Sequence, residues 1–157
     1  MSFYSLSAIN ADGEKIDFSQ FKNQCCLIVN VASKCGLSSK TYKSLVSLSN
    51  VYPSLNILLF PCNQFLEQEP GEMCEIKKFV WNYSKSFNIF DKVDVNGENR
   101  HPVYRFLVSQ KSGWWSDNIK WNFTKFLVNK KGEVVKRYGP LEKVCKDDEY
   151  LIKSLTE

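Results

Sequence analysis

Two apolar runs stand out from an otherwise mixed pattern of hydrophobic and polar residues. Residues 25–31 and 55–60 are almost uninterrupted in apolar character, which is typical of strands that are covered on both faces. Between these runs, apolar residues recur at helical spacing from Ser38 until Pro53 stops the pattern. A helix that connects two buried strands predicts that the strands are parallel.

Shorter strand-like segments flank this unit at both ends of the chain. Residues 3–9 and 14–18 are separated by Ala11-Asp12-Gly13 and predict an N-terminal β-hairpin. Residues 123–128 and 133–138, with Asn-Lys-Lys-Gly between them, predict a second hairpin near the C-terminus. Antiparallel pairs therefore accompany the parallel pair.

The remaining segments complete the expected order of elements. Helices are expected after Pro70-Gly71 and over residues 102–108 and 146–155, with a short extended piece at 90–95. The order is a hairpin, then β-α-β-α, a crossover segment and β-β-α. It predicts an α/β fold, with a mixed central sheet flanked by helices, in a single domain over residues 1–157.

Composition and charge exclude several functional classes. Apolar content of 43%, charged content of 24% and a formal charge of +4 are those of an ordinary soluble globule. Basic residues are scattered among acidic ones, so no nucleic-acid partner is expected. No secretory or membrane-spanning segment is visible. A cytoplasmic location is expected, unless a removed N-terminal extension directs the protein to an organelle.

The cysteines and the single histidine narrow the chemistry further. With His101 alone and no metal-ligand spacing, neither a metal nor another cofactor is expected. No C-x-x-C pair is present, which excludes a thioredoxin-type dithiol site. Cys25 and Cys26 are adjacent in an apolar strand and are expected in the core rather than in a secreted disulfide framework. The six cysteines are Cys25, Cys26, Cys35, Cys62, Cys74 and Cys145, of which the last is expected near the surface.

Cys35 is the strongest candidate for a reactive thiol. It follows the first buried strand and precedes the first long helix. The free N–H groups at a helix N-terminus and the cation of Lys34 favour a thiolate over a thiol. Position alone leaves a buried structural cysteine as an equal alternative.

Four short sequence islands decide between these alternatives. They are Asn-Val-Ala-Ser-Lys-Cys-Gly at 30–36, Phe-Pro-Cys-Asn-Gln-Phe at 60–65, Gln-Glu-Pro-Gly at 68–71 and Lys-Trp-Asn-Phe-Thr-Lys-Phe at 120–126. On these islands the chain resembles the glutathione peroxidase family, in its cysteine rather than selenocysteine form. The similarity runs from Tyr4 to Leu155 and implies the thioredoxin-like fold of that family.

The resemblance also implies a catalytic set and a reaction. The family's tetrad falls on Cys35, Gln68, Trp121 and Asn122, which would reduce hydrogen peroxide and organic or lipid hydroperoxides. A thiolate that attacks a peroxide shifts negative charge to the leaving oxygen, and neutral amide and indole N–H donors stabilise that shift. By residue type alone, Gln64 competes for the amide role, and the Trp-Asn pair is more typical of core and turn residues.

Two positions around the second island need separate interpretation. Cys62 lies between proline and aromatic neighbours, and its equivalent in the family is structural. Leu66 stands where the family usually has glycine. A branched side chain there restricts the backbone, with the expected effect of shifting Gln68 or making the rim of the site more apolar.

The step that reduces oxidised Cys35 has two candidate routes. Many cysteine-type members of the family form an internal disulfide that thioredoxin reduces, but the usual resolving position is Trp81 here. Cys74, about two turns upstream in the same expected helix, is the nearest substitute. A bridge to Cys35 would require Cα atoms within about 7 Å, so local unwinding is expected. The alternative is direct reduction by glutathione.

The chain also resembles the phospholipid-hydroperoxide branch of the family. It lacks the long insertion after Val95 that tetrameric members use for assembly, which implies a monomer with an open site. Trp114 and Trp115, with Lys111 and Lys120 nearby, would either touch a membrane surface or pack into the core.

A second functional hypothesis uses the same site. An oxidised Cys35 can pass its oxidation to a partner protein by thiol–disulfide exchange, in which case the protein is a peroxide sensor. The sequence is compatible with both the peroxidase and the sensor, and the peroxidase is our leading hypothesis.

Overall fold

A mixed five-stranded sheet forms the centre of the molecule. The computed structural model describes residues 2–113 and 116–157. The strands follow the order β5-β4-β3-β6-β7 across the sheet, in which β3, β4 and β5 are parallel and β6 and β7 are antiparallel to their neighbours. Their bounds are β3 (Cys26–Val31), β4 (Asn56–Pro61), β5 (Asn88–Ile89), β6 (Lys125–Val128) and β7 (Val134–Tyr138). The predicted mixed sheet is confirmed.

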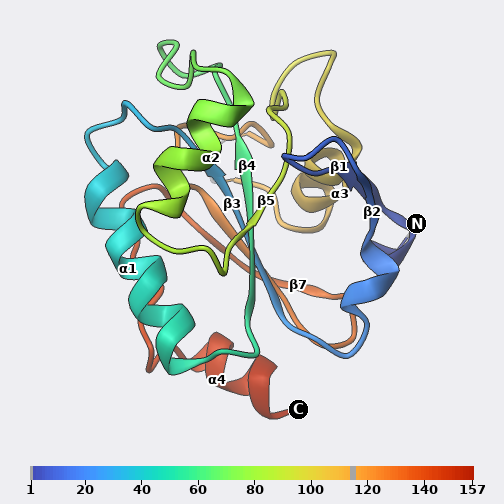
Figure 1. The fold of residues 1–157 in the computed structure, drawn as a ribbon. Coiled ribbons are helices and arrows are strands. Elements are labelled where there is room, and N and C mark those ends of the chain that lie inside the picture. The colour runs from blue at the N-terminus through green and yellow to red at the C-terminus, as the bar shows by residue number, and fades with distance from the viewer. Residues whose placement is uncertain (1, 114–115) are drawn as a thin grey trace.

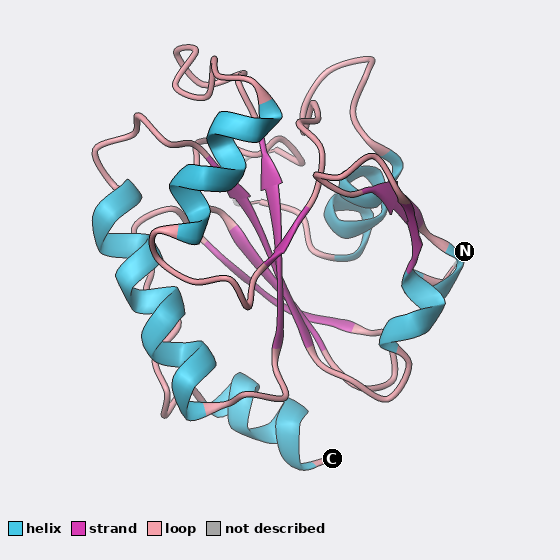
Figure 2. Ribbon diagram, viewed as in Figure 1, coloured by secondary structure: helices cyan, strands magenta, loops and turns pink. Residues whose placement is uncertain are grey.

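Helices cover both faces of this sheet (Figures 1 and 2). On one face lie α1 (Ser38–Val51) and α2 (Met73–Trp81), with α4 (Glu149–Thr156) beyond the lower end of α1 (Figure 1). On the other face lie α3 (Pro102–Gln110) and the hairpin of β1 (Ser7–Ile9) and β2 (Lys15–Asp17) (Figure 1). No helix among the described residues is long and apolar enough to cross a bilayer.

The side chains of β3 alternate between two apolar cores. Cys26 and Ile28 pack in the core under α3, whereas Leu27 and Val29 pack in the core under α1 and α2. All four are fully buried. This is the double burial that the continuous apolar run predicts, because successive residues of a strand face opposite sides of the sheet.

The parallel pair β3 and β4 determines where functional groups can meet. Val31, at the end of β3, pairs with Pro61, at the end of β4. The N–H of Cys62 continues the pairing by donating to the carbonyl oxygen of Val31 at 3.0 Å. The segments that follow the two strands therefore leave the sheet side by side, at the edge where α/β folds place their chemistry.

The first predicted strand, over residues 3–9, is only half correct. Phe3–Ser5 forms a short 3-10 helix, η1, and pairing begins at Ser7. The ring of Phe3 packs against Phe18, with ring centroids 5.1 Å apart, and is 1% exposed. This contact anchors the chain end in the core and replaces the expected strand pairing.

Two other boundaries also differ from prediction. The extended piece was expected at 90–95, but the strand β5 lies earlier in the chain, at Asn88–Ile89. Phe90 makes only an isolated bridge to Asn10. The last helix begins at Glu149 rather than at 146, because the Asp148 carboxylate accepts the N–H of Leu151 at 3.1 Å and caps the helix.

Candidate active site

Cys35 lies in the turn between β3 and α1, which we call the Cys35 turn (residues 33–37). The residue is 7% exposed. Its sulfur accepts the N–H of Leu37 at 3.5 Å, and its carbonyl oxygen accepts the N–H of Ser38, the first residue of α1, at 3.0 Å. No side chain caps this helix, and the N–H of Leu37, directly before it, is directed at the sulfur of Cys35. That arrangement suits an anionic sulfur.

The segment after β4 holds the Cys35 turn from the other side. We call residues 62–72 the Gln68 loop. The carbonyl oxygen of Gln68 accepts the N–H of Lys34 at 2.9 Å, one residue before Cys35. The loop is closed on itself by Asn63, whose side-chain oxygen accepts the N–H of Glu69 at 2.9 Å. Gln68 is thus fixed to the turn through its backbone, while its half-buried side chain remains available.

Asn122 approaches Gln68 from a third segment, just before β6. Its side chain is fully buried, and its amide nitrogen donates to the side-chain oxygen of Gln68 at 2.9 Å. The neighbouring Trp121 is half-buried and packs against the core cluster that contains Cys35, with its ring 5.6 Å from that of Phe65. Residues from three distant segments therefore meet around the Cys35 turn.

Two of the three predicted donor groups, those of Gln68 and Trp121, are not consumed by other contacts within the described part of the chain. Within residues 2–113 and 116–157, neither the side-chain NH₂ of Gln68 nor the indole N–H of Trp121 has a hydrogen-bond partner. Asn122 uses its amide nitrogen on Gln68, and its buried side-chain oxygen has no partner. These polar groups can reorganise around an oxygen that enters the site.

Gln64 is not a competing candidate for the amide donor, because its side chain is occupied elsewhere. Its side-chain oxygen accepts the N–H groups of Val95 at 2.7 Å and Asn96 at 3.0 Å, and its NH₂ donates to the carbonyl oxygen of Asn96 at 2.9 Å. This side chain ties the Gln68 loop to the segment before α3. We interpret Gln64 as structural.

Asn30 is a site residue that sequence reasoning missed. It is fully buried on β3, and its side-chain NH₂ donates to the carbonyl oxygen of Trp121 at 3.1 Å. Its side-chain oxygen accepts the N–H of Thr124 at 3.1 Å, and its carbonyl oxygen accepts the N–H of Phe123 at 2.7 Å. Phe123 adopts a φ of 66°, and Asn30 holds this irregular backbone so that Trp121 and Asn122 face the site. A polar residue within the apolar run was the available signal.

The cysteines of the chain divide into a buried group and an exposed group. All six are free thiols, with Cys74 and Cys145 exposed. Burial raises the pKa of Cys25, Cys26 and Cys62 above the usual value for a thiol, so these three remain protonated and poorly nucleophilic at neutral pH. The expected core placement of Cys25 and Cys26 and the surface placement of Cys145 are confirmed.

Cys74 is an exposed residue of the helix that follows the Gln68 loop. It occupies the first turn of α2 and is exposed, whereas Ile76 and Val80 form the buried face of that helix. Trp81, at the usual resolving position, is 41% exposed and lies under the ammonium groups of Lys77 and Lys85. The structure therefore brings Cys35, Gln68, Trp121 and Asn122 into one region but leaves Cys74 on the outer surface of α2.

Leu66 carries the backbone strain that its departure from glycine predicts. Leu66 and Glu67 have φ values of 54° and 51°, and Leu66 is 77% exposed, so no packing offsets the strain. Leu66→Gly should raise the free energy of unfolding by about 0.5–1 kcal/mol in urea titrations, since relief of a left-handed conformation exceeds the entropy cost of glycine. Leu141→Gly is the control, because Leu141 is equally exposed without a positive φ and should lose stability. An equal decrease in the free energy of unfolding in both variants would show that Leu66 is not strained.

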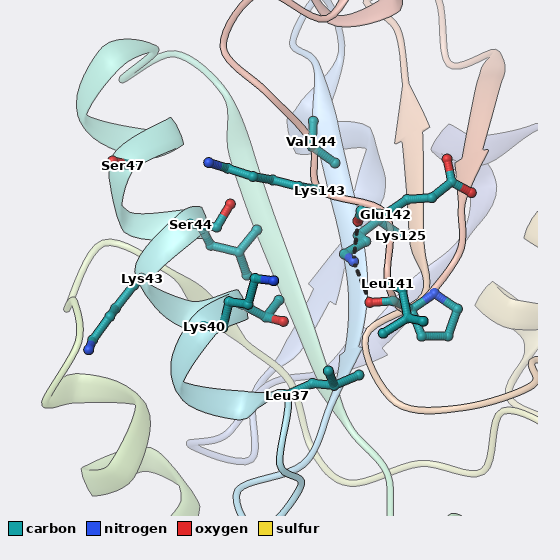
Figure 3. A pocket seen from close by; sticks show the side chains of 13 residues that line it. Leu37, Lys40, Lys43, Ser44, Ser47, Lys125, Leu141, Glu142, Lys143 and Val144 are labelled. Atoms are coloured by element: carbon teal, nitrogen blue, oxygen red, sulfur yellow. Dashed lines mark hydrogen bonds between the residues drawn. The ribbon is translucent and has the colours of Figure 1, made fainter.

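A separate cavity of about 340 Å³ lies between α1 and the loop that follows β7 (Figure 3). Lys125 reaches into this loop and donates to the carbonyl oxygens of Gly139 and Pro140, both at 3.2 Å, and of Glu142 at 2.7 Å. Burial lowers the pKa of Lys125 to about 8. Leu37 of the Cys35 turn belongs to the lining, but none of the predicted site residues does. Lys125 thus braces a loop beside the site.

Comparisons with known proteins agree with this geometry. The family model described as "Glutathione peroxidase" matches residues 3–108. The "Probable phospholipid hydroperoxide glutathione peroxidase" of Nicotiana sylvestris is 49% identical over 142 residues, which cover 88% of this chain and 84% of the relative. The "Probable glutathione peroxidase 3, mitochondrial" of Arabidopsis thaliana is 46% identical over 157 residues, 98% of this chain and 76% of the relative. The solved structure "Crystal structure of T. cruzi GPX1" has a TM-score of 0.82 at 35% identity, over 99% of this chain and 97% of that one.

The strand order and the lone cysteine after β3, without a C-x-x-C pair, place the chain among thioredoxin-like proteins. Within that class, the matched family model spans more than half of the chain, and relatives are nearly half identical over most of its length. The chain belongs to the glutathione peroxidase family, as its four sequence islands predicted, and family membership makes it a peroxidase. Trp121 and Asn122 lie beyond the matched residues of the family model but within the region shared with the solved structure.

Proposed function

We propose that the protein reduces hydroperoxides through Cys35, with Gln68, Trp121 and Asn122 as donors in the transition state. The observation that carries this proposal is the hydrogen bond from Asn122 to Gln68, while the backbone of Gln68 is bonded to the residue before Cys35. Two amides from distant segments are thereby gathered beside one thiol. Preorganised neutral donors of this kind stabilise developing negative charge without competing as nucleophiles.

The first half of the proposed cycle oxidises Cys35. Its thiolate attacks one peroxide oxygen, an S–O bond forms and the O–O bond breaks. The leaving alkoxide or hydroxide accepts a proton and departs as alcohol or water, and Cys35 becomes a sulfenic acid. The free NH₂ of Gln68, the indole N–H of Trp121 and the second N–H of the Asn122 amide are the groups we assign to the leaving oxygen.

The second half of the cycle returns Cys35 to the thiol. In the route that we favour, the Cys74 thiolate attacks the sulfenic sulfur, an S–S bond forms and the S–O bond breaks. The hydroxide that leaves takes up a proton from solvent and becomes water. A dithiol of the thioredoxin type then reduces the disulfide. Since Cys74 is exposed at the start of α2 and Glu72 provides no side-chain cap there, the first turn can unwind at modest cost to bring Cys74 inward. Direct reduction by glutathione is the alternative.

Addition of one equivalent of hydroperoxide to the reduced protein tests both halves. We expect oxidation at Cys35 and a mass loss of two hydrogens, with Cys35 and Cys74 joined in the peptide map. Cys74→Ser should instead retain one added oxygen on Cys35 and lose turnover with thioredoxin, while Cys145→Ser, which also removes an exposed thiol, should behave as the parent protein. A stable sulfenic acid in the parent protein would exclude Cys74. No change at Cys35 would refute the peroxidase proposal.

We further propose that residues 1–157 act as one domain and as a monomer in solution. The suggested membrane contact rests on Trp114 and Trp115, which lie outside the described residues, so it stays a prediction. The mitochondrial name of the Arabidopsis relative supports an organellar form of this protein as an alternative to a cytoplasmic one.

A further inference from the structure

Glu69 is a charged side chain that the protein buries almost completely. It follows Gln68 in the chain and is 1% exposed. One carboxylate oxygen accepts both the N–H of Ser33 at 3.0 Å and its hydroxyl at 2.5 Å. The other oxygen is buried without a hydrogen-bond partner among the described residues. Because burial of a carboxylate costs free energy, packing alone does not explain an acid at this position.

The contacts of Glu69 form a clamp with those of its neighbour. Glu69 binds Ser33, while the adjacent Gln68 binds the N–H of Lys34 through its carbonyl oxygen at 2.9 Å. Two consecutive residues of the Gln68 loop thus hold the two residues that precede Cys35. Glu69 is itself fixed, since its N–H donates to the side chain of Asn63 at 2.9 Å. The carboxylate of Glu69 is therefore bonded to the backbone two residues before Cys35.

We propose that Glu69 is a positioning residue that, as a carboxylate, holds the Cys35 turn in register with the donors of Gln68 and Asn122. This inference rests on the proposed peroxidase function of the same site. Glu69 acts through Ser33 and is not assigned any contact with the peroxide. Hydrogen bonds to a charged acceptor are about twice as strong as bonds between neutral groups, so the charge of Glu69 determines how firmly the turn is held.

The surroundings of Glu69 act on its pKa in opposite directions. Burial raises the pKa of Glu69, whereas the hydrogen bonds from Ser33 and the charge of Lys92 lower it, and the net direction is upward. Tyr42 is fully buried, and its hydroxyl has no partner in the described part of the chain. Its pKa is raised by burial, then by the charge of Glu69 and then by Tyr83. Cys62 also experiences the charge of Glu69, as the weakest of several effects on its pKa.

These shifts predict opposite pH effects on stability and on activity. The folded state disfavours the charged form of Glu69, so this group's contribution to stability is present at low pH. That contribution is lost as pH rises from the ordinary range of a carboxyl through the raised pKa. The clamp on Ser33, by contrast, is strongest above the raised pKa. If Glu69 served only stability, loss of its charge would not slow the reaction of Cys35 while leaving stability equal or higher.

Glu69→Gln separates the two roles, because glutamine keeps an acceptor for Ser33 and removes the charge. The rate constant for oxidation of Cys35 by hydrogen peroxide, followed by stopped-flow tryptophan fluorescence, should fall about five- to tenfold at pH 7.5. The deficit should shrink as pH decreases and the parent protein itself becomes protonated. The urea midpoint should stay equal or rise. Glu69→Ala, which also removes the acceptor, should be slower at every pH.

Glu67→Gln is the matched control. It makes the same chemical change two residues earlier, at an exposed acid with no side-chain hydrogen bond among the described residues, and should leave rate and stability unchanged. An unchanged oxidation rate in Glu69→Gln from pH 5 to 8, or a loss explained by unfolding, would overturn the inference. The rate of Cys35 alkylation by iodoacetamide gives a readout that needs no peroxide. An altered alkylation profile in Glu69→Gln, in a protein whose Cys35 does not react with peroxide, would refute the proposed function while supporting the positioning role.

Discussion

Cys35→Ser should reduce hydroperoxide turnover to the level of the uncatalysed reaction. The hydroxyl of serine is far less acidic than a thiol, so the turn between β3 and α1 holds no anionic nucleophile at neutral pH. Oxidation also requires a sulfur atom to accept oxygen, and serine cannot replace it. Consumption of hydrogen peroxide in the presence of a thioredoxin system or of glutathione measures this loss.

Cys145→Ser provides the control for Cys35→Ser. Cys145 is an exposed free thiol outside the site, so its replacement should leave turnover intact. The serine variant at position 35 should also keep its fold, because oxygen replaces sulfur without loss of the bond from the N–H of Leu37. Peroxidase activity retained in folded Cys35→Ser would mean that another thiol carries the reaction, and the burial of Cys25, Cys26 and Cys62 would leave only Cys74 and Cys145 as candidates.

The sheet and its helices could be predicted from the sequence because their signals are local. The apolar run over residues 25–31 forms a strand buried on both faces, and helical spacing after Ser38 forms α1. The 3-10 turn at Phe3–Ser5 could not be predicted in this way. It depends on a ring contact with Phe18, fifteen residues later, and an alternating pattern contains no information about that contact.

The candidate site was predictable only for residues that the short sequence islands identify by resemblance to the family. Cys35, Gln68 and Asn122 were each named by their islands, and the structure places them in one region. Glu69 and Asn30 were missed although each lies within such an island. Their roles depend on hydrogen bonds to Ser33 and to the backbone before β6, across 36 and 91 residues of sequence. Contacts of that length leave no periodic trace in a single sequence.

These two missed residues explain how loops can form a precise site. The Cys35 turn, the Gln68 loop and the segment before β6 have little regular structure of their own. Asn30 and Glu69 are fully or almost fully buried, and each uses its side chain to hold the backbone of another segment. Directional hydrogen bonds from buried side chains specify one arrangement of these segments more sharply than apolar packing does. The donors are therefore placed by residues that do not take part in the chemistry.

Asn122→Leu should reduce the rate constant for Cys35 oxidation by about 10²- to 10³-fold, the usual consequence of removing one donor from a preorganised site. Leucine is similar in size and cannot donate to Gln68, so the Gln68 amide loses the bond that orients it. Stability should change little. The buried side-chain oxygen of Asn122 has no partner among residues 2–113 and 116–157, and its removal relieves a cost that offsets the lost bond to Gln68. Stopped-flow oxidation and urea unfolding measure the two effects separately.

The step at which Asn122→Leu is slow distinguishes a catalytic donor from a structural residue. Negative charge develops on the leaving oxygen only while the O–O bond breaks, so oxidation should slow while reduction of the oxidised protein keeps its rate. Asn50→Leu, at an exposed position on α1, makes the same change outside the site and should affect neither step. If Asn122→Leu slowed both half-reactions equally, or neither, the hydrogen bond to Gln68 would belong to the architecture of the site and not to its chemistry.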